Sequence, residues 1–139
     1  MIYNLLNVRI HIADFHKETN AVVIYLSDFS CKDNVITKKN KYIMKSTVGN
    51  HLYFSWINYI KDHPTATCII DYPLGIPCEF KVELGRIDEL VDQICGKYRE
   101  IYIEKDKWKV LLGHDIIDLQ LWGILLDTKT NTLRLGVDS

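Results

Sequence analysis

The C-terminal end of the chain carries the pattern that most constrains its fold. Residues 119–126 are apolar on both faces, whereas residues 132–137 alternate Leu133, Leu135 and Val137 with small or charged side chains. Alternation with a period of two is typical of a half-buried strand, and the polar segment 127–131 suits a hairpin loop. The sequence therefore predicts that the last residues complete an antiparallel sheet, with these three apolar side chains buried.

Two helices are predicted upstream of this hairpin. The first begins after Asn50, a favoured N-cap residue, and ends before Pro64. The second spans residues 86–104 and is the clearest element of the chain, because its apolar residues recur at helical spacing. Its stripe consists of Ile87, Leu90, Val91, Ile94, Tyr98 and Ile101. Three acidic residues, Asp88, Glu89 and Asp92, occupy its first turns, where the helix dipole favours negative charge.

Further strands are expected at residues 8–13, 21–26, 65–71, 80–84 and 108–112. The first two would form an N-terminal hairpin, and residues 80–84 could alternatively lead into the second helix. With 139 residues, the chain is expected to be a single globular domain. We predict an α+β fold, with a mostly antiparallel sheet, N-terminal and C-terminal β-hairpins, and two main helices packed on the sheet.

Composition and charge narrow the classes of function. The net charge of −1 argues against broad binding of nucleic acid. The segment from Lys38 to Lys45 is the one basic candidate for such binding, and a lysine-rich turn is more typical of a solvated loop. Residues 1–70 carry eight bases and five acids, whereas residues 71–139 carry nine bases and thirteen acids. The acidic half could face a basic partner.

The four cysteines, Cys31, Cys68, Cys78 and Cys95, show no spacing typical of a zinc or redox site. We expect free thiols in a reducing compartment, and hence a cytoplasmic protein. The sequence shows neither a signal peptide nor an apolar run long enough to span a membrane. No cofactor or metal is expected, because no two of the five histidines lie at helical ligand spacing.

His114 is the one histidine in a setting that could support chemistry. It lies in Gly113-His114-Asp115, with Asp118 three residues further along. A carboxylate beside an imidazole can fix its tautomer for general-base catalysis. The same loop could be structural, with Asp115 capping a turn and His114 donating to a backbone carbonyl. No nucleophile motif accompanies the loop, so we do not expect an enzyme.

The C-terminal third resembles the ending of small bacterial immunity proteins. The resemblance is carried by the run Gly-Lys-Tyr-Arg-Glu-Ile-Tyr at residues 96–102, by Gly-His-Asp-Ile-Ile-Asp-Leu-Gln-Leu-Trp-Gly-Ile at 113–124, and by Leu-Arg-Leu-Gly-Val-Asp-Ser at 133–139. It covers about a third of the chain. Such proteins protect a cell against a polymorphic or contact-dependent toxin, and the resemblance implies a small cytoplasmic α+β protein without catalysis that occludes a toxin domain, often a nuclease. The near-neutral charge departs from the acidic surface expected against a basic nuclease.

The resemblance therefore implies a stoichiometric binding protein whose partner is a cognate toxin domain. The expected contact residues are the acids Asp88, Glu89 and Asp92 together with the loop residues His114, Asp115 and Asp118. Two other classes stay open: a small enzyme or ligand-binding domain built around His114, Asp115 and Asp118, and an accessory subunit of an unrelated complex.

Overall fold

The computed structural model describes residues 2–6, 9–16, 35–36, 51–105 and 114–139. Within these residues the chain forms one mixed sheet of seven strands, two α-helices and a short 3-10 helix. In chain order the elements are β1 (Ile2–Asn4), β2 (Arg9–His11), β3 (Val35–Ile36), α1 (His51–Asp62), β4 (Thr65–Ile70), β5 (Cys78–Glu83), α2 (Ile87–Ile103), η1 (Ile116–Asp118), β6 (Gln120–Asp127) and β7 (Thr132–Asp138). The predicted α+β class is confirmed.

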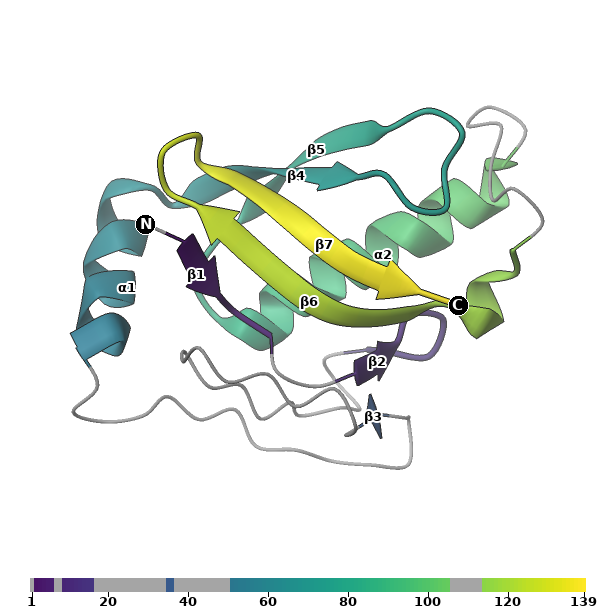
Figure 1. The fold of residues 1–139 in the computed structure, drawn as a ribbon, viewed down its shortest axis with the longest axis horizontal. Coiled ribbons are helices and arrows are strands. Elements are labelled where there is room, and N and C mark those ends of the chain that lie inside the picture. Colours follow the sequence, from purple (N-terminus) through teal and green to yellow (C-terminus); the bar gives the residue numbers. More distant parts are fainter. Residues whose placement is uncertain (1, 7–8, 17–34, 37–50, 106–113) are drawn as a thin grey trace.

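The sheet is built around the C-terminal hairpin. Its strand order is β3-β2-β6-β7-β4-β5, and β1 also pairs with β6 (Figure 1). Strand β6 runs antiparallel to β1, β2 and β7, and β4 runs antiparallel to β5. The two parallel pairs are β4 with β7 and β2 with β3. Because β7 lies between β6 and β4, the last strand joins the two halves of the sheet.

The predicted hairpin is confirmed, with one irregularity. A β-bulge between Leu121 and Gly123 leaves Trp122 as an extra residue on β6. The bulge shifts the alternation by one position, so Leu121 and Ile124 are both fully buried although they are three residues apart. This shift explains why the buried apolar residues of segment 119–126 occupy both odd and even positions in the sequence.

The predicted burial of the closing strand holds only in part. Leu133 is fully buried. Leu135 and Val137 are half-buried, because they pack at the margin of the core instead of inside it. The expectation of three buried side chains was therefore wrong for these two positions.

Helix α2 supplies most of the second layer. All six residues of its predicted apolar stripe are buried, and Figure 1 shows the helix behind the sheet. Strands β4 and β5 contribute Ala66, Cys68, Ile70, Cys78 and Val82 to the same core. No described helix lies over the other face of β6 and β7, which faces the viewer in Figure 1.

Helix α1 packs at the end of the sheet beside β1. Its Trp56 is buried, and the ring makes an edge contact with Tyr3 at a centroid distance of 5.4 Å. The helix ends at Asp62, two residues before Pro64, as predicted. Residues 80–83 belong to β5, so the predicted strand is confirmed for them and the alternative of a helical lead-in is wrong.

Several sequence predictions lie outside the described residues. These are the second arm of the N-terminal hairpin at residues 21–26, the strand at 108–112, the lysine segment 38–45, the Asn50 cap and Cys31. Of the first arm, residues 9–11 form β2, which pairs with β6 and β3. Cys68, Cys78 and Cys95 are free thiols, as expected. No described helix is long and apolar enough to cross a membrane.

Candidate functional site

The His114 loop lies against the last residue of the chain. Nδ1 of His114 is 2.8 Å from Oγ of Ser139. The Tyr72 hydroxyl is 2.8 Å from the same Oγ and 3.4 Å from each ring nitrogen of His114. The Tyr72 and His114 rings meet edge to face at 63°. These three side chains, from three separate segments, form what we call the corner cluster.

The corner cluster is anchored to the core through Tyr72. This residue follows β4, and its carbonyl accepts a hydrogen bond of 2.7 Å from the hydroxyl of Tyr98 on α2. Burial raises the pKa of Tyr98, so its phenol stays neutral and keeps its proton for this bond. Helix α2 therefore fixes the backbone from which the Tyr72 ring projects.

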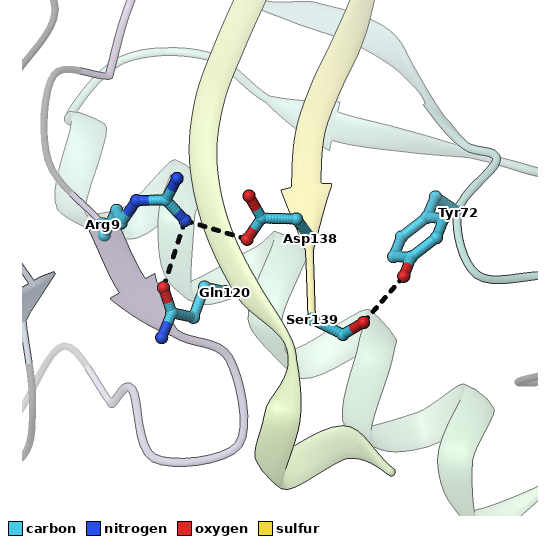
Figure 2. A network of polar contacts seen from close by, with 5 residues as sticks. All are labelled: Arg9, Tyr72, Gln120, Asp138 and Ser139. Atoms are coloured by element: carbon cyan, nitrogen blue, oxygen red, sulfur yellow. Dashed lines mark hydrogen bonds and ion pairs between the residues drawn. The ribbon is translucent and has the colours of Figure 1, made fainter. Parts of the chain in front are cut away.

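The Ser139 side of the cluster is held by the neighbouring strands. Asp138, the last residue of β7, forms an ion pair of 2.8 Å with Arg9 of β2. The same guanidinium nitrogen donates to the side chain of Gln120 at 3.1 Å, as Figure 2 shows. Arg9 thus links β2 to β6 and β7 through Gln120 and through Asp138, the residue that precedes Ser139. Ser139 is therefore held in place by its neighbour in the sheet.

The two carboxylates of the loop have different roles. Asp115 caps η1, since its Oδ1 accepts from the backbone N–H of Ile117 at 3.3 Å. Asp118 ends η1 with an exposed side chain. The predicted capping role of Asp115 is confirmed. The predicted hydrogen bond from His114 to a backbone carbonyl is not observed, because the imidazole of His114 contacts the hydroxyl groups of Ser139 and Tyr72. In the described part of the chain, no hydrogen bond or ion pair joins His114 to either carboxylate.

The acids of α2 lie apart from this loop. Asp88 is buried and forms an ion pair of 2.8 Å with Arg86, while Glu89 is exposed and Asp92 is half-buried. Helix α2 meets the corner cluster at Tyr98, ten residues beyond Asp88, which is about 15 Å along the helix axis. The structure therefore brings His114, Asp115 and Asp118 together, but it does not join them to the acids of α2.

Other reactive groups show no comparable arrangement. Burial raises the pKa of Cys68 and of Cys95 to about 12 and also raises the pKa of Cys78, so all three stay as unreactive thiols at neutral pH. His63 is stacked on Tyr59 at a centroid distance of 4.3 Å. Among the residues that the structure describes, no group of three or more histidines, cysteines and acids is placed to hold a metal ion.

Two members of the corner cluster, Tyr72 and Ser139, were not expected from the sequence. They lie 42 and 25 residues from His114. The ending Asp138-Ser139 belongs to the motif that resembles immunity proteins, and this was the only signal that pointed to Ser139. No signal pointed to Tyr72.

The chain matches no protein-family model, and comparison with curated proteins and with solved structures finds no significant match.

Proposed function

We propose that this protein is a cytoplasmic immunity protein, which binds a cognate bacterial toxin domain and neutralises it by stoichiometric occlusion. The observation that carries the proposal is the contact between His114 and Ser139 at 2.8 Å. These residues belong to two separate parts of the motif that resembles immunity proteins, Gly-His-Asp and the closing Asp-Ser. Their contact makes the motif one compact corner of the molecule, a property suited to a preformed binding surface.

The corner offers negative charge on a fixed support. Asp115 and Asp118 are exposed, and η1 is held between Leu119 of the core and the corner cluster. Exposed carboxylates on a rigid loop can meet basic groups of a toxin and accelerate association. Away from this corner, on α2, Glu89 is a third exposed acid, Asp88 is buried beside Arg86, and half-buried Asp92 lies one turn further along. A nuclease, which binds phosphates with basic side chains, is one class of toxin that fits this charge.

Co-expression tests the proposal. The protein encoded by the neighbouring reading frame, which the proposal takes to be the toxin, is expressed in bacteria with and without this protein, and the purified pair is analysed by gel filtration. The proposal predicts growth arrest by the toxin alone, growth with both proteins, and a complex with one copy of each. If the neighbouring domain is harmless by itself, or if no complex forms at micromolar concentration, the proposal is wrong.

A second candidate, a small enzyme, is favoured by one observation. The Oγ of Ser139 lies within hydrogen-bonding distance of His114 Nδ1, as a nucleophile lies beside its base. Against this, a catalytic base is usually oriented by a third group, and Asp115 is engaged in capping η1. An activated aryl ester separates the candidates: an enzyme would hydrolyse it with a pH-dependent rate that His114→Ala and Ser139→Ala both abolish. The immunity proposal predicts no turnover above that of free imidazole.

A further inference from the structure

The face of β6 and β7 that α2 leaves uncovered has an unusual construction at the bulge. Gly123 and Gly136 are paired across the two strands. A Cβ atom at Gly136 would lie 2.7 Å from the indole ring of Trp122, so the ring lies directly over this glycine. Glycine inside a strand weakens it, and it often marks a place where another group approaches the backbone. The bulge residue and the two glycines thus shape this face together.

A hollow lies at this position. Its volume is about 350 Å³, and its lining includes Asn4, Trp122, Gly123, Leu125, Arg134 and Gly136. The lining is mostly apolar, and Leu125 is 45 % exposed. A concave apolar surface with a few polar groups at its rim is typical of a binding site. The amide of Asn4 and the guanidinium of Arg134 are the polar groups here.

Arg134 supplies a positive charge at the rim. Its side chain is 68 % exposed, and its ion pair with Asp71 measures 3.8 Å. A charge-assisted hydrogen bond measures about 2.7–2.9 Å, so the pairing with Asp71 is loose, and Asp71 is itself largely exposed. A planar guanidinium matches a carboxylate with two parallel hydrogen bonds. The charge at this rim therefore complements a carboxylate on a ligand whose body is apolar.

The surface continues beyond the hollow. A second hollow of about 260 Å³ lies across the Leu125–Arg134 pair and is lined by Ile2, Ile69 and Thr132 among others. Ile2 is 63 % exposed. The two hollows therefore lie on either side of Arg134. This arrangement suits an extended protein segment better than a single compact molecule, because alternate side chains of an extended segment can enter both hollows.

We infer that this face binds a segment of the partner protein that places an aromatic or large apolar side chain in the hollow at Gly123, against the Trp122 ring, and pairs a neighbouring carboxylate with Arg134. The inference rests on the proposed function, since it takes the partner to be the toxin domain. It assigns a contact surface on the side of the sheet opposite α2, in addition to the acidic loop at η1.

A small probe tests the ligand chemistry without the toxin. The probe is 3-phenylpropionate, an aromatic ring with a carboxylate, and 3-phenylpropionamide is its uncharged match. Titration at millimolar concentration, the range expected for so small a ligand, is followed by NMR of the amides of Gly123 and Gly136. We expect saturable shifts with the acid, at least about fivefold weaker binding of the amide, and loss of this difference in Arg134→Gln. The control variant Lys81→Gln, at an exposed position of β5, should leave the difference in affinity between acid and amide unchanged.

The absence of shifts at these glycines, or equal binding of acid and amide, would overturn the inference. The toxin domain provides the second test, with dissociation constants for wild type, Arg134→Glu and the matched reversal Lys81→Glu. We expect weakening of at least about tenfold for Arg134→Glu alone. If the toxin binds both variants equally well, the inference fails and the immunity function stands. If the acid binds as expected but wild type does not bind the toxin, the immunity function and the toxin as occupant fail together.

Discussion

The hydroxyl of Ser139 lies 2.8 Å from Nδ1 of His114, although 25 positions separate the two residues in the sequence. The contact joins the end of β7 to the loop that precedes β6. Tyr72 closes the same cluster from the segment after β4. The end of the chain therefore lies at a junction of three segments, and its removal should affect the whole sheet.

Deletion of residues 132–139 should abolish folding. The deletion removes β7, which lies between β6 and β4, and so separates the two halves of the sheet. It also exposes the buried side chains of Ile124 and Leu126, and an unpaired apolar strand promotes aggregation. Gel filtration and thermal melting should show aggregates without a cooperative transition, while Ser139→Ala remains folded. A soluble, cooperatively melting truncation would contradict the central position of β7.

Leu90→Ala should lower the free energy of unfolding by about 2–5 kcal/mol, as truncation of a buried leucine does. Leu90 is fully buried on the face of α2 that packs on the sheet. The control is Ile103→Ala at the exposed end of the same helix, which should change stability by less than about 0.5 kcal/mol. Urea denaturation measures both. A cost below about 0.5 kcal/mol for Leu90→Ala would place this residue outside the core.

Local periodicity in the sequence predicted the helices and strands of this fold better than it predicted which strands pair with one another. Helix α2 and the hairpin of β6 and β7 were both predicted, because each one buries residues at a regular spacing within a short stretch. The parallel pairing of β4 with β7 was not predicted, since it joins segments more than sixty residues apart and no local pattern encodes it. The antiparallel contact of β1 with β6 was missed for the same reason.

The candidate site, like the sheet, was predictable only where its contacts lie between residues that are close in the sequence. The sequence singled out His114 and the cap at Asp115, because both depend on neighbours within a few residues. Tyr72 is brought to His114 only by tertiary folding. The facing glycines Gly123 and Gly136 were not predicted, because the predicted loop 127–131 places Gly123 opposite Leu135, whereas in the structure Asp127 is still part of β6 and pairs with Thr132. The bulge at Trp122 left no signal in the sequence either.

Alkaline pH should destabilise the protein through its buried thiols. Unfolded thiols lose their protons near pH 9, whereas burial raises the pKa of Cys68 and Cys95 to about 12. Between these values the folded state holds more protons, so stability is complete below about pH 9 and falls as pH rises toward 12. The slope is about 1.4 kcal/mol per pH unit for each thiol.

Urea denaturation between pH 8 and 11 measures this slope for wild type and for Cys95→Ala. All other titrating groups are shared, so the variant should lose about 1.4 kcal/mol less per pH unit than wild type in the steep range. Equal slopes for the two proteins would show that Cys95 does not keep its proton in the fold.

The acidic loop should contribute to the rate of toxin binding. Asp118→Lys should slow association, and more strongly at low salt, because exposed charges act over the Debye length. Asp115→Asn removes the second charge but retains a side chain that can cap η1. The control is Asp62→Lys, an exposed acid at the end of α1, on the opposite side of the molecule in Figure 1. Stopped-flow kinetics that do not distinguish Asp118→Lys from Asp62→Lys would remove the loop from the interface.

The central claim is that this protein acts by stoichiometric occlusion, and titration of toxin activity tests it most directly. A fixed concentration of the proposed toxin, the product of the neighbouring reading frame, well above the dissociation constant, is mixed with increasing amounts of this protein, and the remaining toxin activity is measured. The proposed function predicts a linear fall that reaches zero at one equivalent and does not change with incubation time. Inactivation by a small fraction of an equivalent, progressing with time, or full toxin activity in the presence of excess protein, would contradict it.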